Sequence, residues 1–107
     1  MKINYNGYNG VLIKTTYATS GNMALFLADE EDVFGPPIIV VTVNTNEILP
    51  EGVAYVKDYS ENSVIMSALK EAGVIDEVIG VKESGLVGMP LVKFNMEGIK
   101  SIEEYKH

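Results

Sequence analysis

The sequence contains no cysteine, which excludes disulfides, thiolate nucleophiles and cysteine ligands for zinc. It also contains no arginine: all eight of its basic side chains are lysine. Arginine grips phosphate in a bidentate manner and stacks on bases, so its absence argues against direct nucleic-acid binding. The single histidine is His107, and a terminal side chain is a poor candidate for a general base.

Other familiar patterns are missing as well. No apolar run approaches the roughly 18 to 20 residues that span a bilayer, and residues 1–4 lack the apolar stretch of a signal peptide. We therefore expect a cytoplasmic protein that does not associate with membranes. The sequence contains neither of the glycine motifs that bind phosphate groups, Gly-x-Gly-x-x-Gly and Gly-Lys-Ser/Thr. Its acids do not follow the Asp-x-Asp-x-Asp-Gly pattern of a calcium-binding loop. The sequence thus predicts no cofactor, no metal site and no catalytic residues.

What the sequence has in excess is negative charge. It carries 15 acidic side chains against 8 basic ones, for a net charge of -7. Such a chain is repelled by phosphate, so the partners that match its sign are a basic protein surface or a cation. The alternative is that the charge only keeps a small protein in solution.

Period-two and β-branched patterns predict an all-strand first half and two later strands. If residues 2–5 are also extended, Asn6-Gly7 is predicted to be a two-residue hairpin turn, because both residues tolerate positive φ. A polar loop with Pro36 and Pro37 interrupts the pattern, since proline fits neither a paired strand nor a helix interior. The expected strands cover residues 2–5, 10–17, 23–28, 38–43, 53–56, 77–82 and 91–95.

Apolar residues repeat at helical spacing between residues 61 and 72, which predicts one amphipathic helix. We expect Asp58 with Glu61, or Ser60, to cap its start and Gly73 to end it. The last ten residues are either a short helix or a frayed tail. The 107 residues therefore predict a single α+β domain, with an antiparallel sheet of about five or six strands and the helix packed on one face. The helix contacts the sheet through Val64, Ile65, Ala68 and Leu69.

The first candidate interaction surface lies in the polar loop. Four consecutive acids are followed directly by two apolar residues, so charge could steer a contact that the apolar residues anchor. The alternative is a solvated turn whose phenylalanine folds back onto the core. The candidate partner-binding residues here are Asp29, Glu30, Glu31, Asp32 and Phe34.

The second candidate surface is the polar junction of residues 57–62, between the fifth expected strand and the helix. Its candidate partner-binding residues are Asp58, Tyr59 and Glu61. Helix capping together with a partly buried Tyr59 is the alternative explanation for this junction.

Three short motifs carry a resemblance to a known group of proteins: YATSGNMAL (residues 17–25), TVN (42–44) and VKDYSEN (56–62). With them the chain resembles an uncharacterised family of small acidic proteins from phages, plasmids and conjugative elements of gut and Gram-positive bacteria. The likeness extends roughly over residues 17–95, and the family supplies no catalytic residues. It implies a mobile-element setting, in which small non-enzymatic proteins inhibit host defence, as anti-CRISPR proteins do.

Three functional classes remain open, in this order. The first is a non-enzymatic inhibitor that binds the basic surface of a nucleic-acid-handling defence effector, such as a CRISPR nuclease, because such effectors present basic channels. The second is an accessory or scaffold protein of the mobile element without an inhibitory role. The third is an enzyme whose site the sequence does not display.

Overall fold

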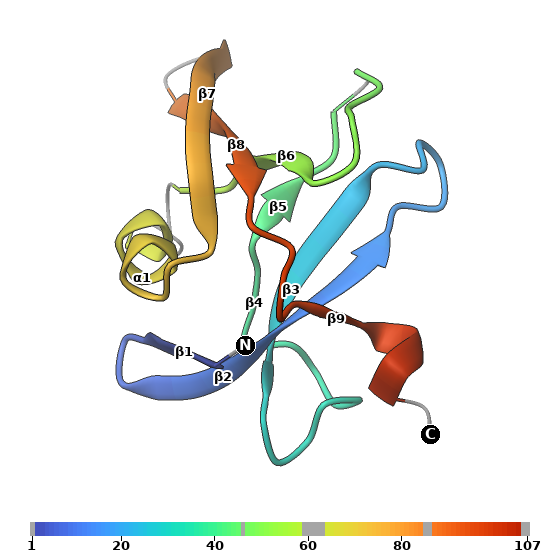
Figure 1. Cartoon of the computed structure of the whole chain (residues 1–107), viewed down its shortest axis with the longest axis vertical. Helices are drawn as coiled ribbons and strands as arrows, with labels where there is room; N and C mark the ends of the chain where they lie inside the picture. Colours follow the sequence, from blue (N-terminus) through green and yellow to red (C-terminus); the bar gives the residue numbers. More distant parts are fainter. Residues whose placement is uncertain (1, 46, 59–63, 85–86, 106–107) are drawn as a thin grey trace.

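The computed structural model describes residues 2–45, 47–58, 64–84 and 87–105 of the chain. In this part of the chain the strands form two sheets, here named sheet A and sheet B (Figure 1). Sheet A has the antiparallel order β1-β2-β3-β4, and a short strand, β9, pairs in parallel with β2. Its strands are β1 (Lys2–Tyr5), β2 (Tyr8–Thr16), β3 (Met23–Asp29), β4 (Ile39–Val40) and β9 (Lys100–Ser101).

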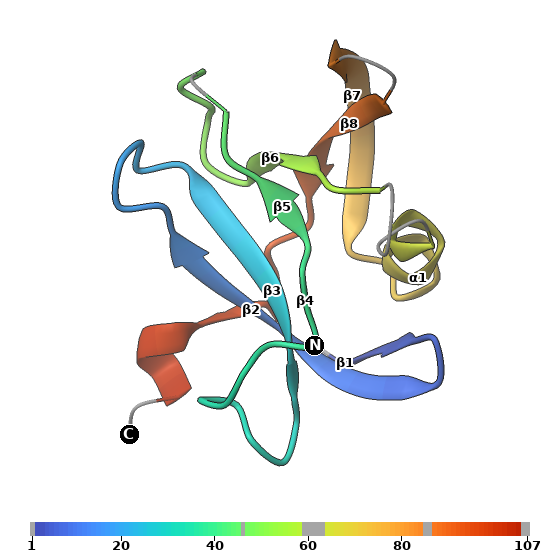
Figure 2. The same cartoon turned by 180° about the vertical axis from the view of Figure 1, so that it is seen from behind.

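Sheet B is antiparallel throughout and has the order β5-β6-β8-β7. The helix α1 (Ile65–Glu71) precedes β7, and a 3₁₀ helix, η2 (Ile102–Tyr105), follows β9. Figure 2 shows α1 beside β7, whereas η2 lies on the side of β2 and β3 that is away from α1. The strands of sheet B are β5 (Thr42–Val43), β6 (Val53–Val56), β7 (Ile75–Ser84) and β8 (Val87–Phe94).

The predicted α+β class, with antiparallel strands and one helix, is confirmed, but the strands occupy two sheets instead of one. The division falls at Val41, inside the strand predicted over residues 38–43. The Val41 N–H donates to the Leu25 carbonyl of β3 at 2.9 Å, whereas its carbonyl accepts from Lys57 N, just after β6, at 2.8 Å. A strand that bends at one residue can belong to two sheets, and its periodicity is unchanged by the bend.

One apolar core joins the two sheets and the helix. The inward faces of β2 and β3 contribute Leu12, Leu25 and Leu27, and sheet B contributes Val56 and Val92. All five side chains are fully buried. Packing of this kind supplies most of the free energy that stabilises a small fold without cross-links. The remaining members of the core are Ile3, Tyr5, Met23, Val41, Ala54, Ile65, Met66, Ala68, Leu69, Val74, Phe94 and Ile99.

The helix is confirmed but begins at Ile65, and Val64 is its N-cap residue. Ile65, Ala68 and Leu69 are buried as predicted, whereas Val64 is 45% exposed and the prediction that it packs on the sheet is wrong. The physical reason is that Val64 precedes the first helical turn, so its side chain is not part of the buried stripe. Among the described residues, no helix is long and apolar enough to cross a membrane.

The strands after the helix are longer than predicted. Residues 87–90 belong to β8, although the sequence placed them in a connecting loop because they include Gly88 and Pro90. Pro90 pairs with Val81 of β7, and the pairing of β8 with β6 covers only residues 91–93. Proline is tolerated where one side of a strand has no neighbour, because its missing N–H is not needed there. The predicted turn at Asn6-Gly7 is confirmed, with φ of 49° and 82°.

Candidate functional site

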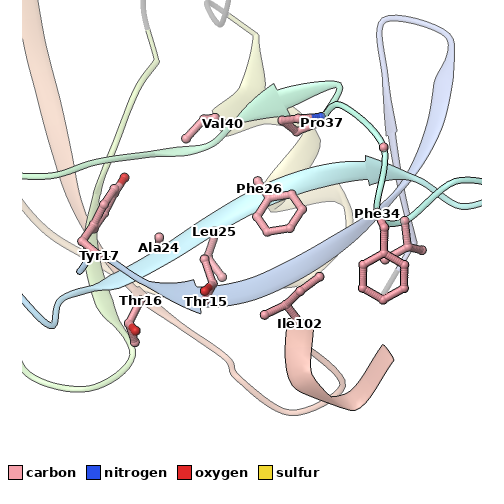
Figure 3. Close-up of a pocket in the computed structure, with 12 residues that line it drawn as sticks. Thr15, Thr16, Tyr17, Ala24, Leu25, Phe26, Phe34, Pro37, Val40 and Ile102 are labelled. Carbon is pink, nitrogen blue, oxygen red and sulfur yellow. The ribbon is translucent and has the colours of Figure 1, made fainter. Parts of the chain in front are cut away.

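The outer face of sheet A carries an apolar groove of about 490 Å³ (Figure 3). Figure 3 shows Phe26 at its centre, Phe34 and Ile102 at one end, and Tyr17 at the other. The polar side chains among the lining residues are Thr15, Thr16 and Tyr17, which lie together where β2 ends. The full lining comprises Thr15, Thr16, Tyr17, Ala24, Leu25, Phe26, Val33, Phe34, Gly35, Pro37, Val40 and Ile102.

The alternation of β3 places an aromatic ring on this face. Successive side chains of a strand point to opposite sides, so Leu25 and Leu27 enter the core while Phe26 points outward. Phe26 lies opposite Ile13 of β2, which is fully buried. Sheet A is therefore apolar on both faces, and its outer face is covered only in part, by the loop after β3 and by η2.

Consecutive tight turns build the acidic loop, here defined as residues 29–37. The Asp29 carboxylate accepts the Glu31 N–H at 2.9 Å, and Asp32 N donates to the Asp29 carbonyl at 3.0 Å. Gly35 N then donates to the Asp32 carbonyl at 3.1 Å, and a Cβ at position 35 would overlap the Asp32 carboxylate. The loop rejoins sheet A where Ile38 N donates to the Leu27 carbonyl at 2.7 Å.

The four predicted acids, Asp29 to Asp32, are all exposed on this loop. Glu30 forms an ion pair with Lys2 of β1, with 3.3 Å between Lys2 Nζ and Glu30 Oε2. Exposed pairs of this kind contribute little to folding. The acidic cluster directly precedes Val33 and Phe34, which line the groove, but none of its four side chains is itself among the lining residues.

Phe34 is 59% exposed, so the alternative in which it folds back onto the core is wrong. Its ring lies at the mouth of the groove near Ile102 (Figure 3). Pro36 and Pro37 come after Gly35, and their rings fix φ at about −65° where the loop returns to sheet A. An exposed aromatic ring beside an apolar hollow is a typical anchor for a protein partner.

The segment η2 also lines the groove, through Ile102, at the same end as Phe34. Glu103 and Glu104 follow it and are exposed, and the Glu104 carboxylate accepts Ser101 N at 2.6 Å, which holds the turn in place. Acidic residues thus adjoin both lining residues in the sequence, because residues 29–32 precede Val33 and Phe34 while Glu103 and Glu104 follow Ile102. Of the two alternatives for the last ten residues, the short helix is the one the structure shows, over residues 102–105.

Asp58, the one residue of the second predicted surface that the structure describes, does not line this groove. The Asp58 carboxylate accepts the Met66 N–H at 3.1 Å, so it binds the start of α1 from outside the helix. Tyr59 and Glu61 lie outside the described residues, as do Ser60 and His107. The N-cap residue is Val64 and it makes no side-chain cap, so the prediction that Asp58 or Ser60 is the N-cap residue is wrong. Asp58 instead binds the Met66 N–H, because the helix begins later than expected.

Two of the three motifs meet in a hydrogen-bonded seam. Tyr17 Oη and Thr42 Oγ1 are 2.9 Å apart, and Thr42 Oγ1 also accepts the Leu25 N–H at 3.1 Å. Ser20 Oγ donates to Asn44 Oδ1 at 2.8 Å. These contacts join the turn between β2 and β3 to the segment that enters sheet B, and they hold Tyr17 at its end of the groove.

Asn22 completes the seam from a buried position. Its side-chain amide donates to the Glu47 carbonyl at 2.7 Å, and its Oδ1 accepts the Leu49 N–H at 3.0 Å. Asn22→Ala leaves both backbone groups without these partners, so we expect the free energy of unfolding to fall by about 1 to 3 kcal/mol. Urea denaturation measures this change. The exposed Asn44→Ala is the matched control, and equal losses in the two variants would contradict a special role of the buried amide.

Glu47, Tyr55 and Lys82 form a polar cluster on sheet B. Tyr55 Oη donates to Glu47 Oε2 at 2.6 Å, and Lys82 Nζ lies 3.1 Å from the same oxygen. The hydrogen bond from Tyr55, followed by that from Lys82, lowers the pKa of Glu47, and the bond to Glu47 raises the pKa of Tyr55. These contacts bind the segment before β6 to β7, and none of the three side chains lines the groove.

Sequence reasoning located one end of the groove and missed its floor. The alternation of β3 places Phe26 on the face of the strand opposite Leu25. A large aromatic residue on the face that does not enter the core was the signal in the sequence for an apolar groove there. Ile102 gave no such signal, because it belongs to a short charged segment. Searches against family models, curated proteins and solved structures give no match to this chain.

Proposed function

We propose that this protein is a non-enzymatic inhibitor that binds the basic surface of a nucleic-acid-handling bacterial defence effector, of the CRISPR nuclease type, in the groove of sheet A. The observation that carries the proposal is the exposed Phe34 ring, which lies at the mouth of an apolar groove two residues after a run of four exposed acids. Aromatic anchors with surrounding charge are typical of protein interfaces.

The apolar lining favours a protein segment as the occupant. The polar atoms of the lining side chains are hydroxyls, and one of these, Tyr17 Oη, is already hydrogen-bonded to Thr42. Apolar side chains of a partner would gain by leaving water when they contact Phe26, Phe34 and Ile102. A partner loop or helix end that carries two or three apolar side chains fits this description.

The charge around the groove favours a basic partner. The acidic loop and the end of η2 both present carboxylates, and the chain carries a net charge of -7. Complementary charge mainly speeds association and rejects partners of the wrong sign. Effectors that handle nucleic acid present basic channels and faces, which would meet this rim with the complementary sign.

Neutralising the acidic loop tests the steering role. In the variant Asp29→Asn, Glu30→Gln, Glu31→Gln, Asp32→Asn, we expect slower association with a purified CRISPR nuclease and a weaker dependence of the association rate on salt. The expected loss is about tenfold at low ionic strength, because steering raises association rates by roughly 10- to 1,000-fold. Biolayer interferometry at low and high salt measures the rate, and nuclease cleavage of DNA measures the inhibition.

The matched control removes four exposed carboxylates elsewhere, with Glu51→Gln, Glu71→Gln, Asp76→Asn and Glu97→Gln. Both variants have the same net charge, so a defect confined to the first one assigns the effect to the loop. If both variants associate and inhibit like the parent at each salt concentration, the acidic loop is a solvated turn. If the parent inhibits no effector of this type, the proposed function is wrong.

A further inference from the structure

A second surface lies on sheet B, away from the groove. The strand β7 is the edge of this sheet, with β8 on one side and no strand on the other in the described part of the chain. Figures 1 and 2 show it along the outside of the molecule, with α1 beside its first residues. Edge strands of this length are usually protected, because their free N–H and C=O groups pair readily with another strand.

The middle of β7 is unusually apolar for a free edge. Val78, Ile79 and Val81 are 42%, 48% and 64% exposed, although all three are β-branched residues that pack well in sheets. Val78 lies opposite Val92 of β8 and Val81 lies opposite Pro90, so the two valines share one face of the sheet. A contiguous apolar edge of this kind favours a strand partner over solvent.

We propose that β7 pairs with β7 of a second copy of this chain, antiparallel and about a two-fold axis between Ile79 and Gly80. The strand is complementary to itself in this register. Val78 of each copy lies opposite Val81 of the other, and Glu77 lies opposite Lys82 of the other. Each contact occurs twice, as a two-fold axis requires.

The irregular centre of the strand fits the same axis. The pairing with β8 skips a residue between Val78 and Gly80, so Ile79 is the extra residue of a bulge. A Cβ built on Gly80 would meet nothing within 4 Å, and this open space receives Ile79 of the second copy. The register also places Asp76 opposite Glu83 at the two exposed ends, where salt screens their repulsion.

The charges that directly flank the apolar centre favour a second copy as the occupant, whereas the like-charge pairs of Asp76 and Glu83 lie farther out. An antiparallel strand from any other protein would have to present a lysine opposite Glu77, a carboxylate opposite Lys82, and a β-branched residue between them. The sequence of β7 already provides all three in the reversed direction. Opposite charges directly across a strand pair stabilise it, and like charges weaken it.

The test is the mass of the full chain in solution, by sedimentation velocity over a wide range of protein concentration. We expect a species of twice the 11.7 kDa chain mass. Glu77→Lys and Lys82→Glu should each raise the dimer dissociation constant by about tenfold, because each sets two like-charge pairs across the interface. Lys82→Glu also removes the ion pair with Glu47, so Glu77→Lys is the variant that changes the interface alone. The double variant should restore the dimer, since the pairs are then reversed but complementary.

Two further variants keep the test decisive. Val81→Lys changes an exposed side chain that the monomer does not need, and it should abolish the dimer while thermal unfolding stays cooperative. Glu97→Lys changes the charge as Glu77→Lys does, away from β7, and should leave the mass unchanged. A parent that sediments as a monomer at every concentration overturns the proposal, and so does a dimer that neither single charge reversal weakens.

Discussion

Phe34→Ala is expected to speed dissociation of the complex with the inhibited effector by about 30-fold or more, which corresponds to the roughly 2 kcal/mol threshold of an interface hot spot. The ring is exposed and lies at the mouth of the groove, so its removal takes contacts from the complex and few from the folded monomer. The association rate should change little, because charge and not the ring governs encounter.

Tyr8→Ala is the matched control for this prediction. Tyr8 is an aromatic residue of similar exposure, at 63%, and it does not line the groove. Biolayer interferometry with both variants gives the two dissociation rates, and urea denaturation confirms that both remain folded. Equal dissociation rates for the two variants would move the anchor of the interface away from the groove.

Leu69→Ala is expected to lower the free energy of unfolding by about 2 to 5 kcal/mol, the range for leucine-to-alanine changes in a packed core. Leu69 is fully buried in the cluster that joins α1 to both sheets. For a domain of this size the loss is a large fraction of the total stability. The midpoint and slope of urea denaturation measure it.

Val64→Ala provides the comparison on the same helix. The sequence pattern placed Val64 and Leu69 on one buried face, whereas the structure exposes Val64 at the N-cap position. The expected change for Val64 is within about 0.5 kcal/mol, as for most surface substitutions. If the two variants lose similar stability, the helix begins earlier than residue 65 and the packing of its first turn has to be revised.

The two proposed surfaces belong to different sheets and have separate tests. The groove lies on the outer face of sheet A, and the self-pairing edge is β7 of sheet B. A two-fold dimer through β7 would present two grooves to partners, so both copies could bind one effector each. If the effector has two matching sites, binding of both grooves would increase avidity without any new contact.

A self-pairing edge also bears on the accessory or scaffold alternative. That alternative expects a symmetric self-interface and no preference for basic partners. The dimer and the groove are therefore informative together. A dimer that inhibits no effector favours the scaffold, whereas stoichiometric inhibition by the parent and by the monomeric Val81→Lys variant favours the inhibitor.

Local patterns predicted most of the elements. Alternation located β3, helical spacing located α1, and the two residues that tolerate positive φ located the turn at Asn6-Gly7. Pro36 and Pro37 likewise predicted an exposed acidic loop. Each of these features is determined by residues that are close together in the sequence, so it can be predicted without knowing the tertiary structure.

What the sequence alone determined about this protein is most of its elements, the acidic charge and the exposed position of residues 29–32. The tertiary structure decided that the strand at Val41 crosses between two sheets, because a bend leaves the hydrophobic period unchanged. It also decided that Phe26, Phe34 and Ile102 form one groove, since these residues come from a strand, a loop and a distant short helix. Periodicity reports which face of an element is apolar, but only the packing of the elements determines which of these faces meet and which remain open to a partner.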